Sequence, residues 1–357
     1  MKGTFSAYHF SVPLVTPYKL SFGPIYSFET FYTVLMADGR IGLGEITPLP
    51  GYNHETPKSV TRELTEFASN LEKDLPFLNL AQDVARRSPF TASGVACAYE
   101  TWLEGPKAAF STPVPKPIPL VGFCGGDTPE QSAQCARKLL EQGYSTLKMK
   151  VGAMKPLEDA ARIRAVANGL RPACAVRLDA NQAYTPDQAL TLCREIEDIQ
   201  VVELLEQPFH PNMWIEHEKL IEQTRLSIML DESIWTEDDV RRAADCGAEL
   251  IKLKLCKHLG MNGSKKIAQS ALELKLGVVY GNGVQTALGN HLEARLYHEM
   301  GLSTASEGNG FLKPLDSPFG HEITVRDGML TDNGIQNFEA VFKRGMLTAQ
   351  ASFSLEP

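Results

Sequence analysis

The stretch from Thr146 to Asn181, TLKMKVGAMKPLEDAARIRAVANGLRPACAVRLDAN, predicts the fold of most of this chain. It begins with a short run of largely apolar residues, 146–151, continues into a helical segment, 156–168, and returns to a second apolar run, 175–178. A strand, a helix and another strand in this order form the unit from which parallel sheets are built. Both strand candidates carry charged residues at or just after their ends, and such charges are costly inside a sheet unless they are paired or bind an ion.

The same alternation of apolar runs and helical segments continues along the chain, at intervals of about 25 to 30 residues, and it predicts an α/β fold with a (β/α)8 barrel of the TIM type. The eight candidate strands are residues 118–123, 146–151, 175–178, 201–205, 227–230, 250–255, 278–280 and 303–305. A doubly wound sheet is the competing fold. It usually carries a GxGxxG loop after its first strand, which Gly122, Gly125 and Gly126 do not form.

The chain on either side of this repeat has a different pattern. Residues 31–36 and 41–46 are strand-like runs around Asp38-Gly39, a hairpin turn signal, and residues 58–103 look mostly helical. Proline and small residues are frequent in 106–119, which is typical of a linker. We expect an α+β capping domain, a barrel domain and a tail that returns to the capping domain. Their expected bounds are 1–115, 116–325 and 326–357.

The composition argues against several classes of protein. The formal net charge is −8 and no run rich in Lys or Arg occurs, so neither nucleic acid nor an anionic membrane is an expected partner. The sequence contains no stretch of about 18 apolar residues, so no membrane span is predicted. The N-terminus lacks the pattern of a secretory signal. The seven cysteines form no CxxC pair, which favours reduced thiols in a cytoplasmic protein.

Charged residues mark five successive candidate strands near their carboxyl ends. They are Lys148 and Lys150, Asp179, Glu206, Asp231, and Lys252 and Lys254. In a parallel barrel all strands end at the same rim, which is where active sites are built. Five consecutive strands that each bring charge to one rim therefore predict an active site there.

The three carboxylates come from neighbouring strands, so they can converge on one point. Asp179, Glu206 and Asp231 offer oxygen ligands without Cys or His, which suits a hard cation such as Mg²⁺, or Mn²⁺. Lys150 and Lys254 flank this trio, which suits acid/base chemistry from two sides. A lysine that acts as a base needs a pKa lowered from about 10.4 toward 7–8. Lys148 has the same strand parity as Lys150 and is the expected second ammonium that tunes it.

The motifs KxK (148–150), DAN (179–181), EQP (206–208) and DES (231–233), with the lysine at 254, resemble the enolase superfamily in its muconate lactonizing enzyme subgroup. That subgroup includes muconate cycloisomerases, N-acylamino acid racemases and o-succinylbenzoate synthases. The segments Ser21-Phe22-Gly23, 42–45 (GLGE) and 48–52 (PLPGY) are similar to loops of the family's capping domain, which closes over the barrel mouth.

The resemblance implies roles for individual residues. Lys150 and Lys254 would be opposing acid/base groups, with Lys148 tuning the first. Asp179, Glu206 and Asp231 would bind the metal. The segment 254–257 matches the family's KxxK pattern, and strand 278–280 is not followed by the histidine that the mandelate racemase subgroup uses there.

Residues that could contact substrate are less clearly marked. The candidates are Asn181, Lys252, Asn282, Glu307 and Tyr52. Asn181 could equally cap the following helix. Lys252 departs from the family, which more often has a small or neutral residue there, and so does the loop 258–263, which lacks a Gly-Gly pair. The sequence EGNG at 307–310 is not the DxD pattern of dipeptide epimerases, which makes a dipeptide substrate less favoured.

We therefore expect Mg²⁺-dependent removal of a proton next to the carboxylate of a small-molecule substrate, through an ene-diolate. The outcome would be racemisation, epimerisation or cycloisomerisation in a homo-oligomer. A dehydratase of the o-succinylbenzoate synthase type is the alternative. A catalytically inactive, metal-dependent binding protein and a phosphate-binding barrel hydrolase or aldolase are alternatives of other classes. An aldolase would need one isolated lysine for a Schiff base rather than lysines beside a carboxylate trio.

Overall fold

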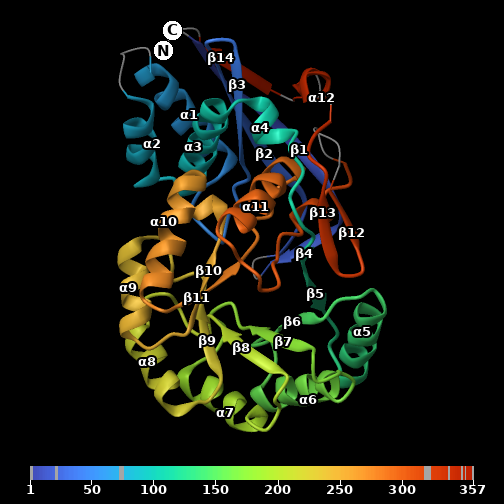
Figure 1. Cartoon of the computed structure of the whole chain (residues 1–357). Coiled ribbons are helices and arrows are strands. Elements are labelled where there is room, and N and C mark those ends of the chain that lie inside the picture. The colour runs from blue at the N-terminus through green and yellow to red at the C-terminus, as the bar shows by residue number, and fades with distance from the viewer. Residues whose placement is uncertain are drawn as a thin grey trace.

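The computed structural model of the chain describes residues 3–20, 23–71, 76–316, 323–336, 338–346, 349 and 351–355. Figure 1 shows two parts, one above the other. The upper part holds the N-terminal strands and helices together with the last elements of the chain. The lower part holds a parallel sheet and most of the helices that follow its strands. Within the described ranges, no helix is both long enough and apolar enough to cross a membrane.

An antiparallel sheet forms the centre of the upper part. It contains β1 (Gly3–Leu20), β2 (Gly23–Ala37) and β3 (Arg40–Ile46), and β14 (Ala351–Leu355) adds to the free edge of β1. The predicted hairpin between β2 and β3 is confirmed. Asp38 and Gly39 have φ angles of 51° and 73°, the left-handed values that a tight hairpin turn requires. The tail thus returns to the first sheet, although the expected domain bounds at 115 and 325 stay predictions.

Three helices cover this sheet: α1 (Pro57–Leu71), α2 (Phe77–Ala85) and α3 (Pro89–Glu104). Helix α3 lies so close to β3 that a Cβ on Gly44 would overlap the carbonyl oxygen of Gly94. Glycine at both positions is therefore what allows the two backbones to meet. The following helix α4 (Pro106–Phe110) and the short strand β4 (Ile118–Pro119) occupy the predicted linker.

The lower part is built on a seven-stranded parallel sheet in the order β11-β10-β9-β8-β7-β6-β5. Its strands are β5 (Val121–Cys124), β6 (Thr146–Lys150), β7 (Ala175–Asp179), β8 (Val202–Glu206), β9 (Ser227–Leu230), β10 (Leu250–Leu253) and β11 (Gly277–Tyr280). These match seven of the eight predicted runs. Neighbouring strands follow one another in sequence, as a succession of strand–helix units requires.

The prediction of an eighth strand is wrong, because residues 303–305 do not form a strand. The chain there makes one isolated bridge, between Leu120 and Ser306. The Ser306 amide donates to the Pro119 carbonyl at 2.8 Å, whereas the Glu307 amide donates to the Tyr280 carbonyl at 3.0 Å. The Val121 amide also donates to the Ser306 carbonyl, at 2.9 Å. This segment thus makes two backbone hydrogen bonds toward the β5 edge of the sheet and one toward β11, without forming a longer ladder with either neighbour. The structure shows a seven-stranded parallel sheet, and a closed eight-stranded barrel is not established.

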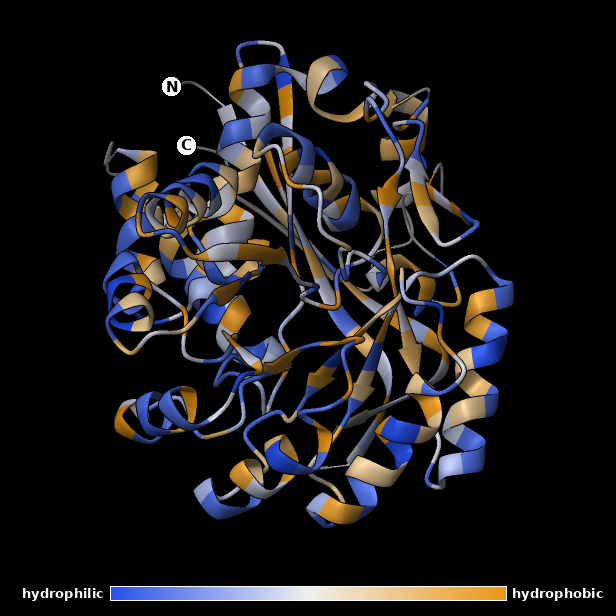
Figure 2. Cartoon of the chain, turned by 60° about the horizontal axis from the view of Figure 1, so that its bottom comes forward, coloured by the Kyte–Doolittle hydropathy of each residue, from blue (hydrophilic) through white to orange (hydrophobic). Residues whose placement is uncertain are grey.

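Helices surround the strands, and each carries both hydrophilic and hydrophobic residues (Figure 2). They are α5 (Pro129–Glu141), α6 (Pro156–Ala167), α7 (Pro186–Ile196), α8 (Trp214–Gln223), α9 (Glu237–Asp245), α10 (Gly260–Glu273) and α11 (Ala287–Glu299). Thr128, Thr185 and Thr236 precede three of them, and each threonine accepts a hydrogen bond from a backbone amide of the first turn. The local sequence thus sets where these helices begin.

Short elements complete the chain. The 3₁₀ helices η1 (Leu255–Lys257) and η2 (Gly310–Leu312) follow β10 and the segment at 306. Strands β12 (Ile323–Arg326) and β13 (Met329–Asp332) form a hairpin that extends β4, and α12 (Phe338–Met346) precedes β14.

Candidate active site

The strand-end charges lie at one end of the parallel sheet. Lys150 pairs in register with Asp179, and Asp179 with Glu206, because β6, β7 and β8 are adjacent parallel strands. Asp231 directly follows β9, and Lys254 directly follows β10. The side chain of Lys150 is 58% exposed, whereas the three carboxylates are at most 2% exposed. Lys150 therefore stands at the opening of the site and the carboxylates at its base.

Lys148 lies at the centre of the carboxylates. Its ammonium is 2.8 Å from Asp179 Oδ2, 2.7 Å from Glu206 Oε2 and 2.8 Å from Glu307 Oε1. Lys252, on β10, contacts Glu206 Oε2 at 2.7 Å and Glu307 Oε1 at 2.5 Å. Glu307 was a candidate for substrate contact, but here its Oε1 atom is shared by two buried ammonium groups.

The outer edge of the site is formed around Asp179. The Lys150 ammonium lies 2.6 Å from Asp179 Oδ2 and also donates to the Asn181 side-chain oxygen. The Asn181 amide nitrogen Nδ2 donates to Glu232 Oε1 at 3.1 Å, and its backbone amide donates to Asp179 Oδ1 at 3.0 Å. Asn181 has a φ of 39°, so it turns the chain at the end of β7 and holds Lys150 and Glu232 in place.

Asp231 has a separate set of partners. The Lys254 ammonium lies 2.7 Å from Asp231 Oδ2, and the Tyr52 hydroxyl donates to Asp231 Oδ1 at 3.1 Å. Lys257 donates to the Asp231 backbone carbonyl at 2.5 Å, with its charge over the Trp235 ring at 4.6 Å from the centroid. Tyr52 comes from the capping part of the chain, so the two parts meet at this carboxylate.

Several residues of the site were not singled out from the sequence, Gln207 and Gly281 among them. Gln207 Oε1 accepts hydrogen bonds from the backbone amides of Asp231, at 2.9 Å, and Ser233, at 3.2 Å. A Cβ on Gly281, after β11, would lie 2.7 Å from Lys252 Cδ and 3.1 Å from Lys254 Cγ. Gln207 belongs to the EQP motif and could have been noticed there, whereas the close approach at Gly281 has no sequence signal of its own.

Burial and charge act in opposite directions on the acids. Burial opposes ionisation of Asp179, but the ammonium groups of Lys148, Lys150 and Lys252 outweigh it and lower the Asp179 pKa. Burial likewise opposes ionisation of Asp231, and Lys254 and Lys257 hold its pKa well below the usual value. Glu206 differs, because burial and the nearby Asp179 charge raise its pKa to about 7 despite its two lysine partners.

Without a bound cation, the pKa values of the two candidate bases are raised rather than lowered. Although 58% of the Lys150 side chain is exposed, the protein around its ammonium removes part of the hydration, which lowers the pKa, but the Asp179 carboxylate outweighs this effect and the pKa is raised. Burial is also outweighed at Lys254, where Asp231 and Tyr52 raise the pKa well above its usual value. Of the lysines here, Lys257 has a lowered pKa, chiefly because of its burial. The physical reason is that each candidate base lies against a carboxylate.

The donor set fits a hard cation, although the side chains do not surround one in this conformation. Among the residues that the structure describes, no group of three or more His, Cys, Asp or Glu side chains is gathered to hold a metal. Lys148 lies between Asp179 and Glu206, and Lys254 lies on Asp231. The other oxygen of Glu206, Oε1, is buried without a hydrogen-bond partner. A buried carboxylate oxygen without a hydrogen-bond partner is expected where the carboxylate binds a cation and the cation is absent.

The remaining substrate candidates have different surroundings. Lys252 has no exposed surface. Asn282 accepts a hydrogen bond from the Val284 amide, and its own Nδ2 is buried without a partner. Ser21 and Phe22, of the first capping-domain motif, lie outside the described residues. The roles assigned from the sequence to these residues and to the lysines and carboxylates stay predictions.

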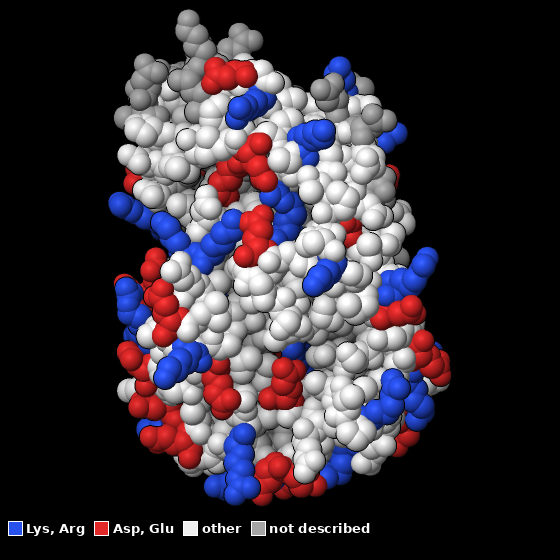
Figure 3. Space-filling view, in the orientation of Figure 1, with Lys and Arg blue, Asp and Glu red and all other residues white. Residues whose placement is uncertain are grey.

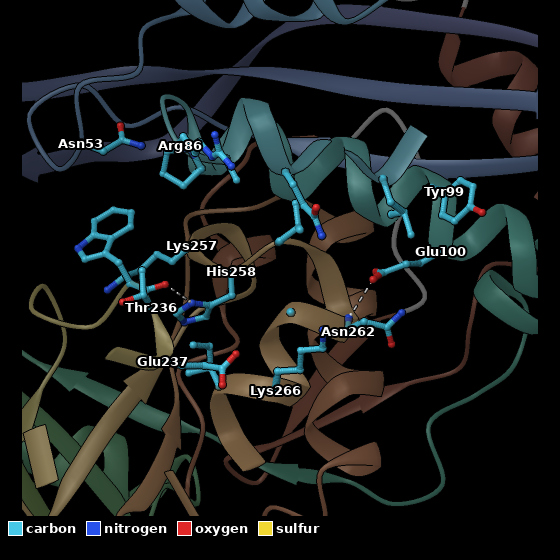
Figure 4. Close-up of a pocket in the computed structure, with 18 of the residues that line it drawn as sticks. Asn53, Arg86, Tyr99, Glu100, Thr236, Glu237, Lys257, His258, Asn262 and Lys266 are labelled. Atoms are coloured by element: carbon cyan, nitrogen blue, oxygen red, sulfur yellow. Dashed lines mark hydrogen bonds between the residues drawn. The ribbon is translucent and has the colours of Figure 1, made fainter. Parts of the chain in front are cut away.

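A cavity of about 770 Å³ lies beside this network, between the helices of the upper part and the helices that follow the strands of the parallel sheet (Figure 4). Arg86, Tyr99 and Glu100 lie on its upper side, and His258 and Lys266 lie below them. Tyr52 and Lys257, which contact Asp231, also line it. On the face in Figure 3, acidic and basic side chains are interspersed and no broad basic patch is present.

The chain is similar to known enzymes over most of its length. Residues 131–334 match the family described as enolase C-terminal domain-like. The L-Ala-D/L-Glu epimerase of Bacillus subtilis is 27% identical over 343 residues, 91% of this chain and 90% of the relative. A solved structure of that epimerase with bound substrate has a TM-score of 0.81 and 25% identity, covering 94% of this chain and 99% of the other.

Two further relatives have other activities. A muconate cycloisomerase of Acinetobacter lwoffii is 25% identical over 307 residues, 81% of this chain and 79% of the relative. An o-succinylbenzoate synthase of Listeria innocua is 27% identical over 296 residues, 79% of this chain and 77% of the relative. The parallel sheet with charges at its strand ends thus defines an enolase-superfamily protein. The chain belongs to the enolase C-terminal domain-like family, as its motifs predict.

Proposed function

We propose that the protein is a divalent-cation-dependent racemase or epimerase that moves a proton on the carbon next to a substrate carboxylate. The observation that carries this proposal is the position of two lysines around one set of carboxylates. Lys150 contacts Asp179 at 2.6 Å and Lys254 contacts Asp231 at 2.7 Å, from β6 and from the end of β10. Three strands, β7, β8 and β9, lie between them.

Two ammonium groups at separate edges of the carboxylates suit proton transfer from two directions. One lysine would remove the proton as a neutral amine and the other would return one as an ammonium. Asp179, Glu206 and Asp231 would hold the cation, Mg²⁺ or Mn²⁺, which when bound neutralises charge on the substrate carboxylate as it becomes an ene-diolate.

The raised lysine pKa values are compatible with this chemistry. The carboxylates that raise the pKa of Lys150 and Lys254 are Asp179 and Asp231, the same groups assigned to the cation. A carboxylate engaged by a cation stabilises a neighbouring ammonium less, which brings the lysine closer to the neutral form that a base needs.

The relatives support this class of reaction. The Bacillus subtilis relative is an epimerase that aligns over nine-tenths of both chains. At 27% identity the substrate does not carry over, so dipeptides, N-acylamino acids and muconates all belong in a first screen. Each of these compounds has a carboxylate next to the carbon that would react, which is what the proposed reaction requires.

Isotope exchange tests the proposal directly. The compounds of the screen, as single enantiomers where they are chiral, are incubated with the protein and Mg²⁺ in D₂O, and deuterium at the carbon next to the carboxylate is measured by NMR together with chiral analysis. We expect racemisation to fall at least about 100-fold in Lys150→Met and in Lys254→Met. Lys138→Met, on α5 and exposed, is the matched control. Absence of exchange with every compound would favour a metal-dependent binding protein.

A second reaction is favoured by a difference between the lysines. The Lys254 side chain is only 10% exposed and lies against Tyr52, whereas that of Lys150 is 58% exposed. Lys150 would then be the one accessible base, and Lys254 would stay a covered ammonium on the opposite side. This arrangement suits loss of a β-leaving group, as in an o-succinylbenzoate synthase. The same incubation distinguishes them, because elimination yields an unsaturated product and no inverted enantiomer.

A further inference from the structure

Lys252 is a charged residue in the middle of a buried strand. It lies on β10 between Ile251 and Leu253, and none of its surface is exposed. Its ammonium lies 2.7 Å from Glu206 Oε2 and 2.5 Å from Glu307 Oε1. A buried ammonium is tolerated only where its charge is compensated, so these two carboxylates are what keep Lys252 inside the sheet.

Lys148 makes the same two contacts from the other side. Its ammonium lies 2.7 Å from Glu206 Oε2 and 2.8 Å from Glu307 Oε1. The four groups thus form a closed ring of alternating charge, in which one oxygen of each glutamate accepts from both lysines. When both glutamates are ionised, two positive and two negative charges balance within this ring. Without Lys252, one ammonium would serve both of these carboxylates and Asp179 as well.

The ring fixes the orientation of Glu206. Because Oε2 is held by Lys148 and Lys252, the other oxygen, Oε1, points away from the ring, and it is buried without a hydrogen-bond partner. Lys252 therefore has two effects on Glu206 as a cation ligand. It positions Oε1, and its positive charge weakens the attraction between the carboxylate and a second cation.

We propose that Lys252 is a positioning residue that serves as the internal counter-ion of Glu206 and Glu307, and that it lowers the affinity of the site for a divalent cation. Without metal, the carboxylates keep their contacts with the lysines. With metal, the same carboxylate oxygens bind the cation more weakly than they would if Lys252 were absent. This inference rests on the proposed metal site and is independent of the reaction that follows.

Removal of the Lys252 charge tests the inference in the full-length protein. We compare wild type, Lys252→Met and the charge-balanced double variant Lys252→Met/Glu307→Gln. Mg²⁺ affinity is measured by calorimetry, and thermal unfolding is followed with and without Mg²⁺. We expect Lys252→Met to bind Mg²⁺ at least about tenfold more tightly, since an extra buried negative charge attracts the cation. Its melting temperature should rise more with Mg²⁺ than that of wild type.

The double variant shows whether charge is the cause. It removes one positive and one negative charge, so its Mg²⁺ affinity should return to within a few-fold of wild type. If Lys252→Met folds only when Mg²⁺ is present, the inference is also supported, because the metal then replaces the missing charge. A folded Lys252→Met that binds Mg²⁺ as weakly as wild type, or more weakly, overturns it. Failure of both variants to fold with Mg²⁺ also overturns it, since Lys252 would then be a packing residue.

The two proposals fail in different ways. If wild type shows proton exchange and binds Mg²⁺ but Lys252→Met has the same affinity, only the role of Lys252 is wrong. If wild type binds Mg²⁺ and Lys252→Met binds it more tightly while no compound undergoes exchange, the proposed reaction is wrong and the role of Lys252 stands.

Discussion

Tyr52 contacts Lys254 in two ways at once. Its hydroxyl oxygen lies 2.9 Å from the Lys254 ammonium nitrogen, and the same nitrogen stands 4.4 Å from the centre of the Tyr52 ring. Tyr52 belongs to the loop after β3, whereas Lys254 directly follows β10. A residue of the upper part thus covers a candidate acid/base at the end of the parallel sheet and limits its access to water, which strengthens the electrostatic interactions of the ammonium.

Substitution of Tyr52 separates the two contacts. Tyr52→Phe keeps the ring over the ammonium and removes the hydroxyl, which bonds both Lys254 and Asp231. We therefore expect kcat/KM to fall at least about tenfold, since one hydrogen bond to a charged group already has about this effect. Tyr52→Leu removes both contacts and should cost more, about 100-fold. Tyr26→Phe, at a residue that is 69% exposed, is the control. Equal activity of Tyr52→Phe and wild type would show that the hydroxyl plays no part in the reaction.

Metal removal tests the carboxylates. A chelator should abolish activity, and added Mg²⁺ or Mn²⁺ should restore it, because the three carboxylates offer oxygen ligands alone. Glu206→Gln should weaken Mg²⁺ binding by at least about tenfold, since an amide oxygen carries no charge to attract the cation. The exposed Glu222, on α8, provides the control variant Glu222→Gln. Full activity in the presence of chelator would contradict the assignment.

The strand ends could be predicted from the sequence because two simple rules apply to them. A short apolar run between helical segments identifies a parallel strand, and parallel strands end at a common edge. Asp179, Glu206 and Asp231 could therefore be assigned to one site from the strand pattern alone. The run at 303–305 fits the first rule equally well, but a strand also needs a neighbour with which to form a ladder, and there it makes one bridge.

The pairing of charges could not be predicted in the same way. Lys252 and Glu307 are 55 positions apart, and nothing in their local sequence indicates that they lie 2.5 Å from each other. The direction of the pKa shifts of Lys150 and Lys254 in the site without a cation could not be predicted for the same reason. It depended on which carboxylate stands beside each lysine, and that depends on side-chain geometry across several strands.

A buried histidine predicts how stability depends on pH. His217, on α8, has no exposed surface, and burial lowers its pKa to about 4. As the pH falls, His217 of the unfolded chain is protonated near its usual pKa of about 6.5, whereas His217 of the folded protein is protonated only near pH 4. The stability that neutral His217 confers is therefore complete above this pKa and is lost as the pH falls toward 4. Between about pH 7 and pH 5 the loss from this residue should be about 2 kcal/mol.

Urea unfolding of wild type and His217→Asn at both pH values measures this contribution. Any general destabilisation by the substitution cancels, because the compared quantity is the change in unfolding free energy between the two pH values within each protein. His210→Asn, at an exposed position, should behave as wild type does. An undiminished pH effect in His217→Asn would show that other groups cause the loss of stability.

The two lysines should also differ in which enantiomer they act on. If Lys150 and Lys254 serve opposite faces of the substrate carbon, each single variant loses the base for one enantiomer and keeps the base for the other. Lys150→Met and Lys254→Met should then each catalyse deuterium exchange from a single enantiomer, with opposite preference, and neither should interconvert the two. Exchange from each enantiomer is measured separately in D₂O under single-turnover conditions. Loss of exchange from both enantiomers in both variants would mean that the lysines act as one unit. If Lys150→Met exchanges neither enantiomer while Lys254→Met still exchanges one, a single base is indicated and the elimination reaction is favoured.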